Sequence, residues 1–181
     1  MRFVVNGHIA SLGFFFCLLL SFALQGCTAC GNSDENVRCR PTREDFIKYN
    51  RRLFWCDSVC IAKYSDSLGL NTQSSPTNLW LTVHNQGTGE QIANGDHVTL
   101  DYSVMTLLGD TLYTSAEDGK LNIVVGKANV CIGLDEALLN LRHDGSVATA
   151  IIIPEKAFGF RGDDRKIHGR VILRYDIKVL N

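Results

Sequence analysis

Several features that would narrow the function of this 181-residue chain are missing from its sequence. Basic and acidic residues nearly balance, 18 against 19, so the chain lacks the concentrated positive charge on which nucleic-acid binding depends. It also has no glycine-rich loop of the phosphate-cradling type, and no Ser-His-Asp order with the motifs that accompany a catalytic triad. The sequence therefore indicates neither nucleic-acid binding, nor a phosphate-binding loop, nor a Ser-His-Asp catalytic triad. The hydrophobic content of 45% still allows a packed core.

The apolar run near the N-terminus is a little shorter than a membrane-spanning helix requires, since such a helix needs about 20 apolar residues. Its apolar run covers residues 12–24, follows a positive start at Arg2 and ends in Gly26-Cys27. A positive start, a short apolar stretch and a small residue before the cleavage point indicate a secretory signal peptide over residues 1–26. The end of the segment resembles a bacterial lipobox, in which Cys27 would be lipidated. A plain signal peptide or an uncleaved anchor helix is the alternative.

Lipidation at Cys27 would hold the mature protein on a membrane, because acyl chains contribute about 0.8 kcal/mol per buried methylene. The expected location is the cell envelope, with the protein anchored by lipid in the outer membrane and facing the periplasm. Export would leave five thiols in a compartment that permits disulfides. They are Cys30, Cys39, Cys56, Cys60 and Cys131. The first four allow three pairings, and the sequence does not choose among them.

Zinc binding is the alternative interpretation of these cysteines. No two of these five form a Cys-x-x-Cys pair with each other, and the five histidines of the chain form no pair at ligand spacing. We therefore expect no metal site, and no cofactor is indicated.

Residues 27–41 are expected to form a tether, and residues 42–77 a helix with a polar connector. Thr42 and Asp45 form an approximate capping pair at the start of this helix. Two rows of mainly apolar residues recur every seven positions, which places them on one helix face. They are Ile47, Phe54, Ile61 and Leu68, with Phe46, Leu53 and Cys60 beside them. We expect this face to dock on the protein's own domain; a homodimer contact or a client-binding arm is the alternative.

From residue 78 onward the periodicity is that of strands, and residues 78–181 are predicted to form one domain. Strands are expected where β-branched and apolar residues alternate between turns, at 79–83, 97–104, 111–113, 121–125, 147–153 and 171–180. A compact helix is expected over 134–142 and a long loop over 155–169, in which the charged run 161–166 would be solvated. This pattern predicts an α+β fold, an antiparallel sheet wrapped around a short helix and preceded by the N-terminal amphipathic helix.

Six short motifs follow one another between residues 79 and 181. They are Gly87-Thr88-Gly89, Gly95-Asp96 with Val98, Asp101-Tyr102, Gly126-Lys127 with Val130-Cys131-Ile132-Gly133-Leu134, Pro154-Glu155-Lys156-Ala157-Phe158-Gly159, and Leu173-Arg174-Tyr175-Asp176-Ile177. In this order they resemble the FKBP-type peptidyl-prolyl isomerases. The signal, tether and helix are similar to those of membrane-attached members from Bacteroidetes-type bacteria. The resemblance implies an FKBP-like fold and an apolar pocket that binds a proline ring.

The resemblance implies catalytic roles for four residues, three of which depart from the family pattern. Tyr102 keeps an aromatic residue of the family. Tyr113 stands where a helpful Asp is usual, although an ordinary strand residue is the other interpretation. Cys131 replaces an Ile whose backbone N–H holds a substrate carbonyl, and the residue is otherwise a small buried apolar group. Phe158 replaces a Tyr whose hydroxyl donates to the ligand.

The resemblance also implies six substrate-binding residues: Leu112, Leu121, Val130, Leu134, Ile167 and Tyr175. Leu112 and Leu121 stand where aromatics are usual, and Leu134 replaces the Trp of the pocket floor. Val130 and Ile167 are kept, and Tyr175 replaces Phe.

The function implied is isomerisation of X–Pro bonds in exported proteins, which would assist folding in the cell envelope. Such a site needs no covalent step, because it binds the twisted amide better than the planar one. The substituted pocket keeps a second interpretation open, a non-catalytic binding or chaperone module. A structural lipoprotein is the third, if Tyr113 or Tyr175 fills the pocket. The expected partners are proline-containing segments of exported proteins and, through the lipid, a membrane.

Overall fold

The computed structural model describes residues 40–74, 77–127 and 129–180. The predicted signal peptide, Cys27, Cys30 and Cys39 lie outside the described residues. The chain divides into two units, Met1–Asp45 and Phe46–Asn181, so that the N-terminal helix from Phe46 onward belongs with the strands.

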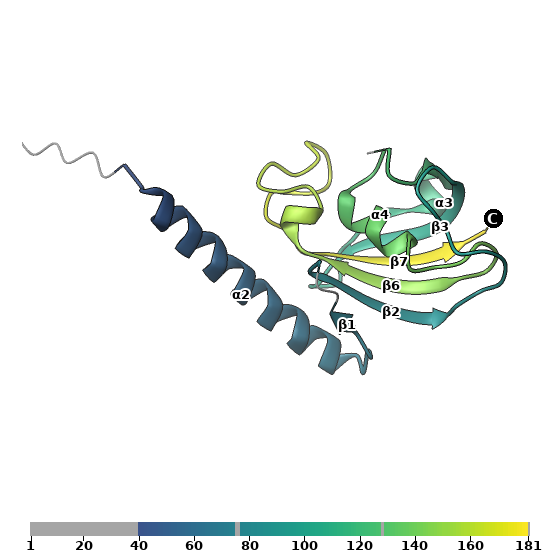
Figure 1. The fold of residues 1–181 in the computed structure, drawn as a ribbon, viewed down its shortest axis with the longest axis horizontal. Coiled ribbons are helices and arrows are strands. Elements are labelled where there is room, and N and C mark those ends of the chain that lie inside the picture. Colours follow the sequence, from purple (N-terminus) through teal and green to yellow (C-terminus); the bar gives the residue numbers. More distant parts are fainter. Residues whose placement is uncertain (1–39, 75–76, 128, 181) are drawn as a thin grey trace, which may run out of the picture. The chain divides into compact units, whose positions relative to one another are not determined.

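The predicted N-terminal helix is present as α2, Arg43–Ser67 (Figure 1). Thr42 Oγ1 accepts from the Asp45 N–H at 3.2 Å, and Asp45 Oδ2 accepts from the Thr42 N–H at 2.9 Å. This reciprocal capping satisfies two backbone donors at the helix start, as the sequence predicts. The helix ends two residues before Gly69, whose φ of 62° lies in the left-handed region that glycine adopts at little cost.

A seven-stranded antiparallel sheet follows in the described part of the chain (Figure 1). Its strands are β1 (Gln73–Ser74), β2 (Leu79–Asn85), β3 (His97–Thr106), β4 (Thr111–Thr114), β5 (Leu121–Val124), β6 (Val147–Ile152) and β7 (Leu173–Val179). The order is β1-β2-β6-β7-β3-β4, and β5 pairs with the first half of β3. The six predicted strands are confirmed, and the two-residue β1 is an addition.

The predicted compact helix is α4, Ile132–Leu138, and it lies over one face of the sheet (Figure 1). It is shorter than the predicted range of 134–142 and begins two residues earlier. Leu134, Leu138 and Leu141 are nevertheless all buried. The winding continues past the helix because the Leu141 N–H donates to the Leu138 carbonyl at 2.9 Å, a 3₁₀-type bond. Two short elements were not predicted, α3 (Ser115–Asp118) and the 3₁₀ helix η1 (Pro154–Lys156).

Adjacent residues of β6 belong to two different apolar clusters. Ile152 lies in the main core with Leu134 and Leu138 of α4, whereas Ile151 packs with Ile61 of α2 in a second cluster. Successive side chains of a strand point to opposite faces of a sheet. The second half of α2 and α4 therefore cover opposite faces of this one.

Docking of α2 on the protein's own domain holds for Phe54 and Ile61 but not for the whole predicted face, since Cys60 and Leu68 are exposed. Ile61 is fully buried, and the ring centroid of Phe54 lies 6.4 Å from that of Trp80 on β2. Phe46 and Ile47, which belong to the same predicted face, are 55% and 48% exposed. Within the described residues, no helix has the length and hydrophobicity needed to cross a membrane.

Candidate functional site

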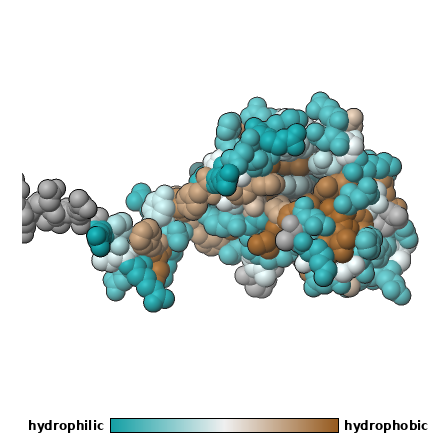
Figure 2. All heavy atoms as spheres, turned by 90° about the horizontal axis from the view of Figure 1, so that it is seen from above, coloured by the Kyte–Doolittle hydropathy of each residue, from teal (hydrophilic) through white to brown (hydrophobic). Residues whose placement is uncertain are grey.

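A cavity of about 400 Å³ lies beside α4, between the sheet and residues 153–172, which we call the late loop. It is lined by Tyr102, Val104, Tyr113, Leu121, Asn129, Val130, Cys131, Leu134, Ala157, Phe158, Ile167 and Tyr175. Figure 2 looks onto the side of α3, α4 and the late loop and shows apolar surface framed by hydrophilic side chains. A mainly apolar hollow of this volume is typical of a small-ligand site.

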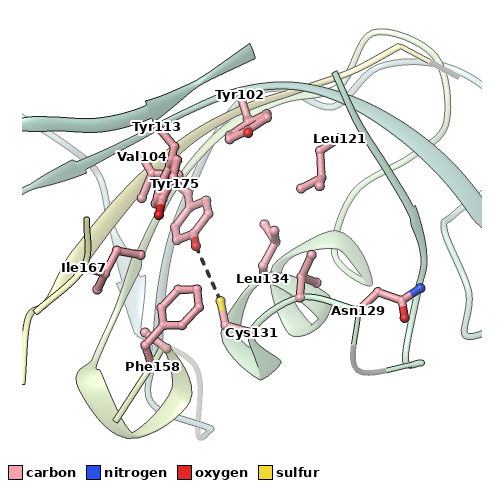
Figure 3. A pocket seen from close by; sticks show the side chains of 12 residues that line it. Tyr102, Val104, Tyr113, Leu121, Asn129, Cys131, Leu134, Phe158, Ile167 and Tyr175 are labelled. Atoms are coloured by element: carbon pink, nitrogen blue, oxygen red, sulfur yellow. Dashed lines mark hydrogen bonds between the residues drawn. The ribbon is translucent and has the colours of Figure 1, made fainter. Parts of the chain in front are cut away.

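The sheet supplies one wall of the cavity through three neighbouring strands. Val104 of β3 is paired with Tyr113 of β4 on one side and with Tyr175 of β7 on the other. Directly paired residues point to the same face, so these three side chains form a row. Tyr102, two residues before Val104 on β3, points the same way. The tyrosine rings of this wall are seen together in Figure 3.

The start of α4 and the late loop supply the other walls. Leu134 of α4 is buried and contributes the floor, with Cys131 one turn before it. Phe158 and Ile167 come from the two arms of the late loop and face the tyrosines across the cavity (Figure 3). Aromatic side chains therefore contribute to the wall from both the sheet and the loop.

Nine of the ten residues named by the resemblance line this cavity, and Leu112 does not. The reason is a bulge: Val104 pairs with Tyr113 and the next residue, Met105, pairs with Thr111, which leaves Leu112 as the extra residue of β4. Leu112 is half-buried and packs against the main core instead.

In the structure Tyr113, rather than Leu112, contributes an aromatic side chain to the cavity wall. The next residue, Thr114, is the last of β4. The Thr114 hydroxyl accepts from the Glu117 N–H at 3.3 Å and caps α3. β4, Thr111–Thr114, therefore carries no carboxylate.

A carboxylate nevertheless reaches the edge of the cavity from the late loop. The Tyr113 hydroxyl donates to Asp163 Oδ2, and Asp163 Oδ1 accepts from the N–H groups of Arg165 at 2.9 Å and Ile167 at 2.8 Å. The ammonium of Lys166 lies 4.8 Å from the centroid of the Tyr113 ring. The prediction of a solvated run over 161–166 holds for Lys166, which is exposed, but not for Asp163, which is half-buried and bonded to Tyr113.

Burial and hydrogen bonding set the charges around the cavity. Desolvation raises the pKa of Asp163, but the bonds from the Tyr113 hydroxyl and from two backbone N–H groups outweigh it, so the pKa is lowered and the group is anionic at neutral pH. Burial raises the pKa of Tyr102, Tyr113 and Tyr175, with the charge of Asp118 adding to the effect at Tyr102. The phenols are therefore neutral.

The thiol of Cys131 is also kept neutral. Burial raises its pKa, and Cys131 Sγ lies 3.8 Å from the Tyr175 hydroxyl, to which it donates (Figure 3). A buried neutral thiol is a poor nucleophile. Cys131 precedes α4 in extended backbone, and no backbone carbonyl among the described residues accepts from its N–H.

The other candidate ligands are scattered. Cys56 and Cys60 are exposed free thiols on α2. In the described part of the chain, no three His, Cys, Asp or Glu side chains lie close enough to hold a metal ion. The chemistry that this cavity offers is thus apolar surface with neutral hydrogen-bond donors.

Three lining residues and one supporting residue were missed by the sequence interpretation. Val104 could have been found from its spacing of two from Tyr102 on a predicted strand. Ala157 belongs to one of the recognised motifs, and Asn129 adjoins Val130 of another. Asp163 carries no local signal, because its contact with Tyr113 joins residues fifty positions apart in sequence.

Comparison with known proteins agrees with this architecture. The family model for FKBP-type peptidyl-prolyl cis-trans isomerase matches residues 88–180. Peptidyl-prolyl cis-trans isomerase FKBP9 from Homo sapiens and that from Mus musculus are each 33% identical over 87 residues, which are 48% of this chain and 15% of the relative. The chain therefore matches only a small part of these longer proteins.

Two solved structures share the fold. AtFKBP13 aligns with a TM-score of 0.57 and 24% identity, covering 61% of this chain and 98% of that one. FkpA from Escherichia coli aligns with a TM-score of 0.61 and 22% identity, covering 76% of this chain and 63% of that one.

Proposed function

This chain belongs to the FKBP-type peptidyl-prolyl cis-trans isomerase family, and from that premise we propose that its cavity binds X–Pro segments and accelerates their cis–trans isomerisation. The observation that carries the proposal is the cavity itself, about 400 Å³ with walls of tyrosine, phenylalanine and aliphatic side chains. It remains open although Tyr113 and Tyr175 both line it. A cavity of this kind suits a proline ring with part of a neighbouring side chain.

Rotation about an X–Pro bond requires no bond to be made or broken. Its barrier of about 18–20 kcal/mol arises because the twisted amide loses resonance. An apolar cavity helps by removing water from the amide, and directed hydrogen bonds help by stabilising the twisted form. In this chain Leu134 and Phe158 supply apolar surface, and the Cys131 N–H is the proposed donor to the substrate carbonyl.

The charge pattern of the cavity edge bears on how much rate enhancement to expect. The carboxylate of Asp163 is engaged by the Tyr113 hydroxyl and by two backbone N–H groups. It is therefore a fixed negative charge behind the wall and not a group free to contact substrate. This arrangement, together with the Leu134 floor, favours the second candidate, a non-catalytic binding or chaperone module.

The proposed setting is the cell envelope, and the proposed clients are exported proteins. Isomerisation of X–Pro bonds takes tens of seconds without a catalyst and can limit the folding of such clients. We further propose that Cys27 carries the lipid that attaches the protein to the outer membrane on its periplasmic side. Mass spectrometry of the protein from bacterial membranes tests this, because an acylated Cys27 must appear as the mature N-terminus.

The exposed half of α2 is the proposed contact in a homodimer. Phe46, Tyr49 and Trp55 are 55%, 53% and 65% exposed there. Light scattering on the wild type and on Trp55→Glu tests this contact. Loss of a dimer in the variant would support it, and a monomeric wild type would exclude it.

Isomerase activity is tested directly by exchange NMR on a short X–Pro peptide with the full chain, which reads the rate without a coupled protease. Tyr102→Ala should lower the rate constant about tenfold or more, a loss of ~1.4 kcal/mol of transition-state stabilisation. Val130→Asp, which places a charge in the apolar wall, should do the same. Leu108→Ala is the matched control, since Leu108 is 92% exposed and is not among the lining residues.

The outcomes separate the two candidates. Acceleration that is lost in Tyr102→Ala and kept in Leu108→Ala establishes an isomerase. Peptide shifts at the cavity without acceleration establish a binding module. A folded wild type that does neither overturns both.

A further inference from the structure

The late loop, which carries Phe158 and Ile167 of the cavity, is tied to α2 by an ion pair that crosses 113 positions of sequence. Arg170 Nη2 donates to both carboxylate oxygens of Asp57, at 3.0 and 2.9 Å, and Arg170 Nη1 donates to Glu155 Oε1 at 2.6 Å. One guanidinium nitrogen thus holds Asp57 and the other holds Glu155, and the planar group fixes the direction of both contacts. The helix is thus joined to the loop by oriented contacts.

Arg170 is also where the two arms of the late loop meet. Its N–H donates to the Gly159 carbonyl at 2.8 Å, and the Gly159 N–H donates to the Pro154 carbonyl at 2.7 Å. Gly159 follows Phe158 directly in the chain. A displacement of Arg170 would therefore be passed to Phe158 through one hydrogen bond and one peptide unit.

The backbone of Arg170 is held in an unfavourable conformation. Its φ of 64° lies in the left-handed region, which costs a residue other than glycine on the order of 1 kcal/mol or more and persists only where the surroundings fix it. The side chain supplies that constraint, since it is bonded to α2 on one side and to Glu155 on the other.

The Asp57–Arg170 pair contributes position more than stability. Asp57 is 7% exposed, and burial raises its pKa although Arg170 acts in the opposite direction. Ionising Asp57 is therefore costly in the folded protein even with its partner present. Pairs of this kind add little net stability, and their best-attested role is to specify one arrangement.

We propose that Asp57 of α2 is a positioning residue for the cavity, which acts through Arg170 to fix the late-loop wall. The helix α2 then contributes to the site, because its docking determines how well Phe158 and Ile167 are placed. The late loop has further ties, Lys156 to Glu136 of α4 at 2.6 Å and Asp163 to Tyr113, so the loss of Asp57 should loosen the loop without detaching it. The inference rests on the proposed function for its binding consequence alone.

The first test needs no substrate. Hydrogen exchange on the full chain should show faster exchange at the amides of Gly159, Gly162 and Arg170 in Asp57→Asn, with β6 and β7 unchanged. Asp66→Asn, an exposed acid on the same helix, should leave all of them as in the wild type. Arg170→Lys provides a second variant, because lysine keeps the charge but cannot bridge Asp57 and Glu155 with a planar fork.

The second test measures binding and its coupling. The probe is a blocked Ala-Leu-Pro-Phe peptide, whose affinity should fall about fivefold or more in Asp57→Asn. If Asp57 acts through Arg170, the double variant Asp57→Asn/Arg170→Gln should bind no more weakly than Arg170→Gln alone. Additive losses, or late-loop amides as protected in Asp57→Asn as in the wild type, would overturn the inference. If the wild type does not bind the peptide, the proposed function fails, and the exchange experiment still decides the role of Asp57.

Discussion

The two faces of the sheet are covered by different kinds of contact. On the α4 face, a large apolar core that includes Leu138 and Leu141 packs beneath the cavity. On the α2 face, the fully buried apolar residues of the second cluster are Ile61, Ile151 and Ile153. The first core is large enough to determine the fold of the domain, whereas the second provides only a small apolar contact for a helix.

Polar pairs complete the contact on the α2 face. Besides Asp57 and Arg170, Arg174 of β7 donates to the Tyr64 hydroxyl of α2 at 3.1 Å. Apolar contacts tolerate sliding, while hydrogen bonds with a required direction do not. Apolar burial therefore holds the strands together, whereas a few oriented polar contacts fix the position of α2 on the sheet.

The largest effect is expected from a cavity in the main core. Leu138 is fully buried, and Leu138→Ala should lower the free energy of unfolding by about 2–5 kcal/mol because the surrounding residues cannot close the space. Urea denaturation measures this. Leu108→Ala is the control and should change the value by less than about 0.5 kcal/mol, since Leu108 is exposed. Equal losses in the two variants would contradict the assignment of the main core.

A smaller and more local effect is expected on the α2 face. Ile61 is also fully buried, but its partners Phe54, Tyr64 and Trp80 are only partly buried and can close around the gap. Ile61→Ala should therefore cost about 2 kcal/mol. Hydrogen exchange should rise along α2 before it rises in β6 or β7. Simultaneous loss of protection in helix and sheet would show that the two faces are not separable.

How much of this could be read from the sequence depends on the range of the contact. Thr42 with Asp45 was identified because capping joins neighbours, and the strands were found because alternation is local. Leu112 was expected in the cavity wall, and the bulge that accompanies its absence from the wall leaves no local mark in the sequence. The cavity residues were predicted from the resemblance to family motifs and not from local patterns in the sequence.

What escaped prediction consists of polar contacts between distant segments. Asp57 lies on the docked face of α2, four residues before Ile61, where an apolar residue would be expected. Only the approach of Arg170 explains a carboxylate there. In the same way, the sequence shows Asp163 only as one charge in a polar run. Its contact with Tyr113 depends on the folding of the late loop.

A third prediction concerns the edge of the cavity. Tyr113→Phe removes the hydroxyl that donates to Asp163 and should cost about 1 kcal/mol in the free energy of unfolding. The amide of Ile167, which donates to the same carboxylate, should exchange faster. Tyr49→Phe is the matched control on the exposed half of α2 and should be neutral. An unchanged Ile167 amide would mean that Asp163 holds the loop without Tyr113.

The smallest expected effect is a pH dependence, to which two carboxylates contribute with opposite sign. Burial raises the pKa of Asp57 above 3.8, so the folded protein binds this proton more tightly than the unfolded chain. The resulting stability is fully present below pH 3.8 and is lost as the pH rises through the raised pKa. The pKa of Asp163 is lowered from 3.8, so its stability is present above that pH and is lost as the pH falls through the lowered pKa.

Unfolding in urea at a series of pH values from about 2 to 6 separates these contributions. Relative to Asp57→Asn, the wild type should lose stability as the pH rises above 3.8. Relative to Asp163→Asn, it should lose stability as the pH falls below 3.8. The result for Asp57 would then report on the contact of the late loop with α2. The result for Asp163 would report on the contact of the loop with the cavity wall. Curves that stay parallel across the whole range would mean that neither carboxylate has a different pKa in the folded protein and in the unfolded chain, which contradicts the pKa shifts of Asp57 and Asp163.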